Sequence, residues 1–245
     1  MKTLDIHQVF ELNREFETAP TERILEWAWS DFGRRAAIGT SFQGAGLVMI
    51  DLAQKTGLEF PVFTIDTGLL FPETLELKKR LEDFFHIEIE SLEPELTVEQ
   101  QHQAHGPELW NREPDHCCLM RKVIPLQKKL ESLDVWITGL RREQSAERKQ
   151  IDVLETYEFD PVMNRNILKL NPMANWTRDG VWKYIQSNNI PYNPLHDRGY
   201  RSIGCIPCTR AVSNDENDRA GRWTGFEKTE CGIHTFMKKT TIRKL

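Results

Sequence analysis

The stretch RAAIGTSFQGAGLVMIDLA, residues 35–53, decides the fold. Residues 35–40 predict a short buried strand, and residues 47–53 predict a strongly apolar helix. The Ser/Gly-rich turn between them offers backbone N–H groups and a helix N-terminus to an anion. No Gly-Lys-Ser/Thr follows and the glycines lack the dinucleotide spacing, so neither common phosphate-binding motif is present.

Further strands and helices alternate on both sides of this unit. Strands are predicted at 61–66, 87–89 and 134–139, with a helix at 72–85 between the first two. Residues 153–159 and 167–170 predict a hairpin, Thr177 begins a helix that runs to about 188, and residues 5–32 predict one or two amphipathic helices. This order predicts an α/β fold with a single mostly parallel sheet flanked by helices, and ligands at the carboxyl ends of its strands.

The chain of 245 residues is long enough for one large domain with appendages. We expect an N-terminal helical segment at 1–34, a nucleotide-binding domain at 35–224 and a mobile C-terminal tail at 225–245. The net charge of -5 argues against nucleic-acid binding. No apolar run reaches the length of a membrane span, so we expect a cytoplasmic protein without membrane contact.

The five cysteines suggest a metal site and a separate reactive thiol. Two form the pair Cys205-x-x-Cys208 and two are the adjacent Cys117 and Cys118. An odd count without a secretion signal does not fit a disulfide framework. On spacing alone, four thiols first indicate zinc, and Cys231 is left over.

The end of the chain adds groups that suit anion chemistry. Arg219 and Arg222 are close in sequence, and Cys231 is followed three residues later by His234. Helical spacing places Lys122 on the same face as Cys118. Clustered cations in an acidic protein indicate a small anionic ligand.

These motifs resemble a known family. WTRDGVWKYIQSNNIPYNPLHDRGYRSIGCIPCT, the upstream cysteine pair and the Glu-Cys-Gly-Ile-His run at 230–234 closely resemble the bacterial assimilatory adenylylsulfate (APS) reductases, over about residues 35–236. The resemblance implies an adenine-nucleotide α-hydrolase-like fold and a 4Fe-4S cluster in place of zinc. It assigns the cluster to Cys117, Cys118, Cys205 and Cys208, and makes Cys231 the nucleophile.

The resemblance also implies the residues that hold the substrate. Lys122, Arg219 and Arg222 match positions around the phosphosulfate, and Arg148 matches a further anion-contacting arginine when one residue nearby is deleted. The segments that hold the adenosine contain Ser41, Phe42, Gly44, Ile65, Asp66 and Gly139. Relatives often carry Ser where this chain has Gln43, so we expect the turn to bind through its backbone N–H groups.

The expected reaction is reduction of adenylyl sulfate to sulfite and AMP, in sulfate assimilation for cysteine biosynthesis. The Cys231 thiolate would displace AMP at sulfur and leave an S-sulfocysteine. His234 and the cations would favour its ionisation. The chain lacks the extra redox domain of plant-type enzymes, so thioredoxin or glutaredoxin would release the sulfite.

Three alternatives remain open at this stage. The substrate could be the 3′-phosphorylated analogue PAPS, alone or together with APS. The protein could instead be a zinc-stabilised nucleotide-binding module without turnover. A homo-oligomer is compatible with either activity.

Overall fold

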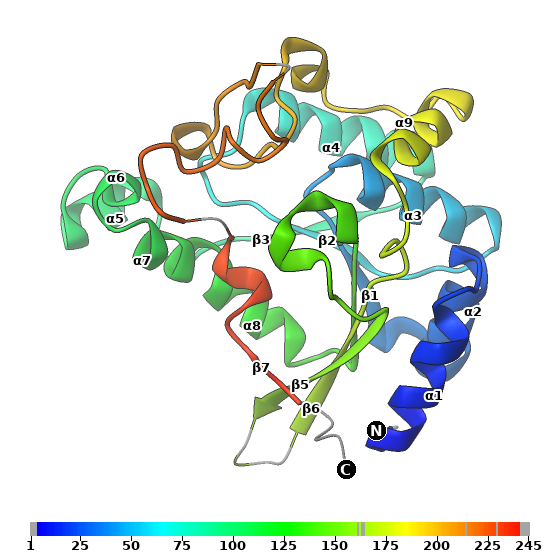
Figure 1. The fold of residues 1–245 in the computed structure, drawn as a ribbon. Coiled ribbons are helices and arrows are strands. Elements are labelled where there is room, and N and C mark those ends of the chain that lie inside the picture. Colours follow the sequence, from blue (N-terminus) through cyan, green and yellow to red (C-terminus); the bar gives the residue numbers. More distant parts are fainter. Residues whose placement is uncertain (1–3, 161, 163–164, 214, 229, 241–245) are drawn as a thin grey trace.

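A computed structural model of the protein describes residues 4–160, 162, 165–213, 215–228 and 230–240. Within them seven strands form one sheet in the order β3-β2-β1-β4-β6-β5-β7, with helices on both faces (Figure 1). The strands are β1 (Ala36–Gly39), β2 (Val62–Ile65), β3 (Ile89–Leu92), β4 (Val135–Thr138), β5 (Leu154–Asp160), β6 (Arg165–Leu170) and β7 (Lys238–Lys239).

The α-helices are α1 (Ile6–Phe16), α2 (Thr21–Phe32), α3 (Gly44–Lys55), α4 (Pro72–Phe85), α5 (Val98–His105), α6 (Leu109–Arg112), α7 (Pro114–Cys118), α8 (Ile124–Leu130) and α9 (Arg178–Ser187). Short helices of other types are η1 (Gly33–Arg35), the π-helix η2 (Leu119–Val123), η3 (Arg142–Gln144), η4 (Ala146–Arg148), η5 (Pro194–Arg198), η6 (Ile206–Cys208) and η7 (Gly232–His234). Among these described helices, none combines the length and the apolar character that crossing a membrane requires.

The sheet is parallel except at one side. Strand β1 pairs in parallel with β2 and β4, β2 with β3, and β4 with β6. Strand β5 pairs antiparallel with β6 and with β7. The predicted α/β class, mostly parallel sheet and hairpin are therefore confirmed.

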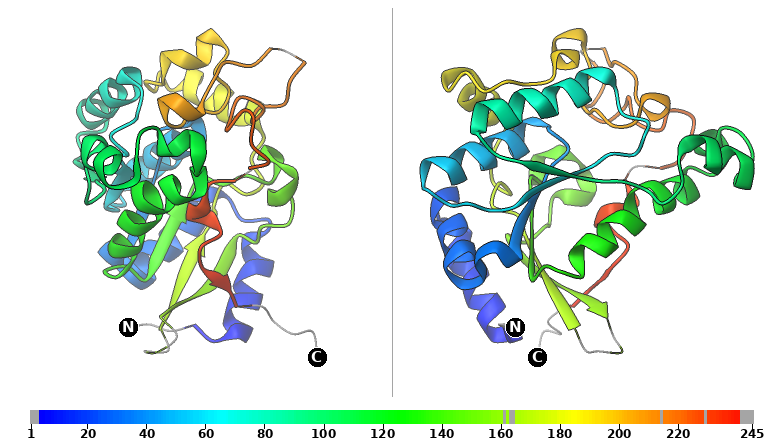
Figure 2. Two further views of the ribbon diagram at one scale, coloured as in Figure 1. Left: turned by 90° about the vertical axis from the view of Figure 1, so that its left-hand side faces the viewer. Right: turned by 180° about the vertical axis from the view of Figure 1, so that it is seen from behind.

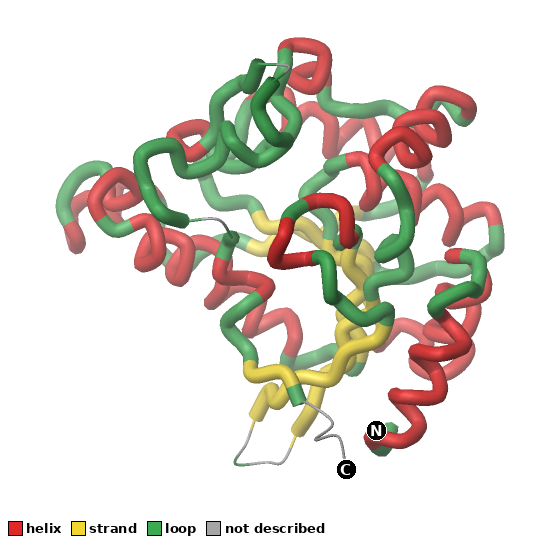
Figure 3. Tube along the Cα trace, viewed as in Figure 1, coloured by secondary structure: helices red, strands yellow, loops and turns green. Residues whose placement is uncertain are grey.

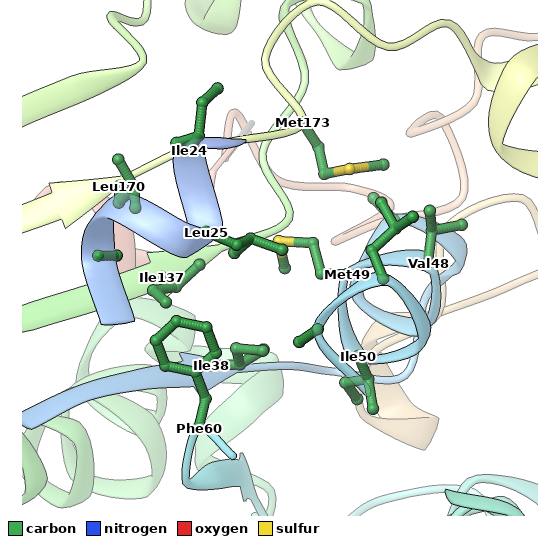
Figure 4. Packing of buried hydrophobic residues seen from close by; sticks show 14 of the residues in the cluster. Ile24, Leu25, Ile38, Val48, Met49, Ile50, Phe60, Ile137, Leu170 and Met173 are labelled. Carbon is green, nitrogen blue, oxygen red and sulfur yellow. The ribbon is translucent and has the colours of Figure 1, made fainter. Parts of the chain in front are cut away.

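Successive side chains of the central strands point to opposite faces of the sheet, so each face has its own hydrophobic core. Ile38 of β1 and Ile137 of β4 face α2 and α3, whose Leu25 and Met49 fill the space between them (Figure 4). The intervening Ala37 and Trp136 face the other side, where α8 supplies Leu126 and Leu130. This period of two is the pattern of strands buried on both faces.

The N-terminal helices form where the sequence predicts them and join the main core. Asp5 and Gln8 cap α1 reciprocally, and Pro20 separates α1 from α2. The Asn13 amide bonds both backbone groups of Leu154 on β5, at 2.7 and 2.8 Å. The predicted segments 1–34 and 35–224 thus share one core, of which residues 1–3 lie outside the described part.

The third strand differs from its prediction, which placed it at residues 87–89. The chain leaves α4 through a left-handed residue, His86 (φ 54°), and the Ile87 N–H bonds back to the Glu82 carbonyl. These residues are used for the turn, so pairing with β2 begins only at Ile89.

The C-terminal segment lies against the sheet in this structure. Ile233, Phe236 and Met237 pack on the α8-side core, and β7 pairs with β5. Figure 2 shows this segment, drawn in red, running past α8 to the sheet edge. In this structure the predicted mobile tail is therefore packed from Ile233 to Lys239, while residues 229 and 241–245 lie outside the described part. Figure 3 shows that the chain before it, after α9, is mostly loop.

Candidate active site

The turn after β1 is shaped by its own residues. The Thr40 hydroxyl accepts a hydrogen bond from the Phe42 N–H (2.9 Å), and Phe42 adopts a left-handed φ of 57°. The Phe42 ring is 2% exposed and packs in the core, so this residue shapes the turn and does not line the site. The Gln43 amide donates to the Ser41 hydroxyl and to the Ile203 carbonyl, at 3.2 and 3.3 Å. The Gln43 side chain therefore connects this turn to the loop that carries Cys205 and Cys208.

A cavity of ≈ 240 Å³ opens at the carboxyl ends of β1, β2 and β4. It collects most of the residues that the sequence singles out: Ser41, Gly44, Ile65, Lys122, Gly139, Arg148, Cys205, Arg219, Arg222, Cys231 and His234. Phe42, Asp66, Cys117, Cys118 and Cys208 lie outside its lining. The Asp66 carboxylate caps its own turn by accepting from the Gly68 N–H (2.8 Å).

The four predicted ligand cysteines are free thiols. Cys117, Cys118 and Cys205 are buried, and Cys208 is half-buried. Burial and then Cys205 raise the pKa of Cys117, and the same two causes raise the pKa of Cys208 to about 11. The Thr67 hydroxyl lies 3.2 Å from the Cys205 sulfur. The thiols thus influence one another inside the protein and are not oxidised to disulfides.

Two cations of the π-helix η2 lie among these thiols. Burial lowers the pKa of Lys122, but Cys205, Cys231 and Cys118 outweigh it, so the net shift is upward and the ammonium is favoured. Arg121 is 3% exposed and donates to the Thr67 carbonyl (2.5 Å) and to Gln101 (3.0 Å). The sequence predicts the first of these cations and misses the second.

The Cys231 thiol is favoured as a thiolate. Without a bound cluster, a hydrogen bond from the Cys118 thiol holds the pKa of Cys231 well below the ordinary value, and Lys122 and Arg222 lower it further against burial. The same hydrogen bond raises the pKa of Cys118. A low thiol pKa near cations is the condition for a reactive cysteine.

His234 packs against the sheet, close to the cations of the cavity. Its ring stacks on Trp136, with centroids 5.3 Å apart and an interplanar angle of 12°. Burial, followed by Lys169, Arg148 and Arg219, holds the pKa of His234 well below its usual value. A neutral imidazole cannot stabilise the thiolate by charge, so Lys122 and Arg222 provide that effect instead.

Trp223 organises the arginines. Its backbone has a φ of 47°, and its indole is 2% exposed. The guanidinium of Arg222 lies 4.4 Å from the ring centroid and that of Arg219 lies 5.7 Å from it. Arg222 also donates to the Ser202 hydroxyl at 3.3 Å. Trp223 therefore orients two cations over the face of its ring.

Glu230 is the main residue that sequence reasoning missed. Its carboxylate accepts from Arg148 Nε (2.8 Å) and Nη2 (2.7 Å) and from Arg219 Nη2 (3.2 Å). Burial, followed by Arg148, lowers the pKa of Arg219 to about 10. The only available signal was its position directly before Cys231 in the quoted motif.

Arg141 and Arg142, whose roles sequence leaves open, differ from each other. Arg142 pairs with Glu17 through both guanidinium ends, at 2.5 and 2.9 Å, and joins the loop to α1. Arg141 lines the cavity and pairs with Glu143 at 3.0 Å.

Comparisons with known proteins agree with this geometry. The model of the phosphoadenosine phosphosulfate reductase domain matches residues 35–211. An adenosine 5′-phosphosulfate reductase of Oceanobacillus iheyensis is 44% identical over 220 residues, which is 89% of this chain and 90% of that protein. A phosphoadenosine 5′-phosphosulfate reductase of Gloeobacter violaceus is 42% identical over 226 residues, 91% of this chain and 92% of that protein.

A solved structure gives the same result at the level of the fold. The phosphoadenylyl-sulfate reductase of Candida auris, crystallised as a phosphate complex, superposes with a TM-score of 0.74 at 28% identity, covering 86% of this chain and 99% of that one. The chain therefore belongs to the phosphoadenosine phosphosulfate reductase domain family, as its cysteine pairs and its Glu-Cys-Gly-Ile-His motif predict.

Proposed function

We propose that the protein reduces adenylyl sulfate (APS) to sulfite and AMP. The observation that carries the proposal is the single cavity shared by the Cys231 thiol, by Lys122 and Arg222, and by the turn that opens α3. This brings together a nucleophile, cations for a phosphosulfate, and backbone donors for a nucleotide. The activity named for the relative from Oceanobacillus iheyensis supports the same choice.

In the first step the Cys231 thiolate attacks the sulfur of APS. A sulfur–sulfur bond forms while the bond from sulfur to the phosphate oxygen of AMP breaks, and AMP leaves with that electron pair. The product is an S-sulfocysteine. Lys122, Arg219 and Arg222 offset the repulsion between the anionic partners and stabilise the charge that develops on AMP.

In the second step an external dithiol of the thioredoxin or glutaredoxin class attacks the Cys231 sulfur. Sulfite leaves with the electron pair of the sulfur–sulfur bond, and a mixed disulfide remains. The second thiol of the reductant then displaces Cys231, so the dithiol supplies the two electrons and ends as a disulfide. The reducing cytoplasm suits this chemistry, and the pathway would be sulfate assimilation for cysteine biosynthesis.

Ser41, Gly44, Ile65 and Gly139 are the proposed contacts of the adenosine, since all line the cavity beside the β1–α3 turn. Phe42 and Asp66 would act by fixing the backbone next to it. All proposed contacts belong to one chain, so the scheme holds for a monomer or for a homo-oligomer.

A 4Fe-4S cluster held by Cys117, Cys118, Cys205 and Cys208 completes the proposal. Within the described ranges no three His, Cys, Asp or Glu side chains converge on a point that could hold one metal ion. Four thiols that are buried or half-buried and form no disulfide are the donor set of such a cluster, which when bound would supply a charged centre beside Lys122. Iron and sulfide content of anaerobically prepared protein tests this assignment.

PAPS is the second candidate substrate. Arg178 and Arg201 also line the cavity and share the carboxylate of Asp218, at 3.6 and 3.4 Å. Two arginines with one acid between them could receive a 3′-phosphate. The relative from Gloeobacter violaceus carries the name of a PAPS reductase.

The deciding experiment is anaerobic, thioredoxin-dependent sulfite formation from APS and, separately, from PAPS. We expect wild-type protein with its full cluster to act on APS, and Cys231→Ser to be inactive while binding AMP normally. Activity that survives in Cys231→Ser would refute the nucleophile. No sulfite from either substrate would favour a nucleotide-binding module.

A further inference from the structure

The ion pair between Glu230 and Arg148 joins the segment that carries Cys231 to the body of the protein. Arg148 donates two hydrogen bonds to the two carboxylate oxygens, and the two side chains are 11% and 14% exposed. Ser145 adds a third donor at 3.4 Å. A shielded, bidentate arginine–carboxylate pair fixes direction as well as distance.

We propose that this pair is the clamp that seats Cys231 in the cavity, and that Arg148 is a positioning residue that acts on the reaction through Glu230. The inference rests on the nucleophile assignment in the proposed function. Glu230 directly precedes Cys231, so fixing its carboxylate restricts the backbone from which the thiol projects.

On the other side of the clamp, hydrogen bonds within the loop hold Arg148. Arg148 Nη1 donates to the Gln144 amide oxygen at 2.5 Å, and that oxygen also accepts from the Arg141 N–H at 3.1 Å. Both contacts lie in the η3–η4 loop that follows β4. The guanidinium is therefore directed at Glu230 by the loop that holds it, and its three nitrogens are engaged within the protein.

The negative charge of Glu230 has a second effect, and this effect distinguishes a clamp from a residue that binds the substrate directly. The cations that line the cavity include Lys122, Arg148, Arg219 and Arg222, and the Glu230 carboxylate pairs with Arg148 and Arg219. Removing the charge of Glu230 should loosen Cys231 and slow its attack. It should also make the cavity more positive, which favours an anionic substrate.

The first test compares Glu230→Gln with wild-type holoenzyme at equal iron content. Formation of S-sulfocysteine in a single turnover should slow about tenfold at saturating APS, as expected for losing a charged hydrogen bond, while the half-saturating APS concentration stays the same or falls. Without substrate, iodoacetamide should label Cys231 faster, as counted by peptide mass spectrometry. A merely structural role of Glu230 would not increase labelling at this one thiol.

Two control variants match this change. Glu227→Gln removes the same charge from an exposed position in the same segment. Glu17→Gln breaks the bidentate pair with Arg142 away from the cavity. Both should keep wild-type turnover and labelling. If Glu230→Gln behaves like these controls, the clamp does not exist.

The second test is a double-mutant cycle of Glu230→Gln with Arg148→Gln. If Arg148 acts through Glu230, the double variant loses no more rate than the worse single variant. Losses that multiply would mean that Arg148 acts on the substrate itself, and would overturn the proposal. Failure of the proposed function would appear separately, as sulfite formation by Cys231→Ser.

Discussion

Arg222 is positioned by three neighbours at once. The Trp223 ring lies beneath its guanidinium, Ser202 accepts one of its hydrogen bonds, and Gly204 leaves space for it. A Cβ at Gly204 would collide with the Nη2 atom of Arg222. The absence of a side chain at residue 204 is therefore part of the anion site.

Gly204→Ala should displace the Arg222 guanidinium without breaking the core. We expect kcat/KM for APS to fall about tenfold, the size of a lost charged contact, with a change in melting temperature of only a few degrees. Steady-state kinetics and thermal unfolding of the same preparation check this. Unchanged kinetics would mean that Arg222 does not need its observed position.

Lys122 should contribute to the first chemical step. It lies among the Cys118, Cys205 and Cys231 thiols, which raise its pKa and favour its charge. Lys122→Ala should slow S-sulfocysteine formation by about a hundredfold, as for loss of one preorganised cation or donor. Rapid-quench mass spectrometry measures this rate, and iron content shows whether the cluster is kept. Full activity with an intact cluster would contradict the role of Lys122.

At the scale of elements, the π-helix η2 carries Arg121 and Lys122 to the group of thiols proposed to hold the cluster. It connects α7, which ends in the cysteine pair, to α8 on the sheet. A π-turn closes i→i+5 hydrogen bonds and is wider than an α-turn, and such turns occur often at functional sites. Regular α-helical spacing predicted the shared face of Cys118 and Lys122 but did not predict the wider turn that accompanies it.

Strand β7 is held by charge as well as by pairing. The Lys239 ammonium contacts Asp152 at 2.8 Å and Glu155 at 2.7 Å, and Glu155 is 3% exposed. Lys239→Ala should lower the free energy of unfolding by about 1–2 kcal/mol, since a buried acid loses one partner. It should also speed proteolysis within the C-terminal segment. Lys238→Ala, at an exposed position with a 3.7 Å contact, is the control. Equal protease resistance in both variants would mean that charge does not hold β7.

For the whole molecule, two half-buried histidines make stability depend on pH. Burial is the main cause that lowers the pKa of His196 and of His234 below the ordinary value of about 6.5. Below about pH 6.5 these two histidines become protonated in the unfolded chain, whereas they stay neutral in the folded protein. Their contribution to the free energy of unfolding is therefore fully present above about pH 6.5 and is lost as the pH falls.

Anaerobic urea unfolding at pH 7.5 and at pH 5.5 measures this dependence. The free energy of unfolding should fall toward acid, with a slope of at most about 1.4 kcal/mol per pH unit for each histidine. His196→Gln should flatten the slope. An equal slope in the variant would show that His196 takes up its proton as readily when folded.

The sequence predicts the regular part of this fold because local patterns determine it. The helix at 72–85 begins at a proline and follows the apolar period, and its observed bounds are the same. The strand before residue 89 was misplaced because a left-handed His86 turns the chain, and no local pattern marks it.

The candidate site was predictable where residue type alone carries the chemistry. Cysteine pairs, Cys231 and the paired arginines stand out in the sequence. The contact of Glu230 with Arg148, 82 residues away, and the stacking of His234 on Trp136 depend on how the folded C-terminal segment meets the sheet. No periodicity records such contacts, so they could not be predicted from the sequence.

The pairing of β7 with β5 also protects the protein from its neighbours. An uncovered strand at the border of a sheet offers free N–H and C=O groups to any other chain. If the C-terminal segment left this position during the proposed release of sulfite, the border at Tyr157 and Glu158 would lose its partner strand. A fast return of the segment would then guard solubility as well as turnover.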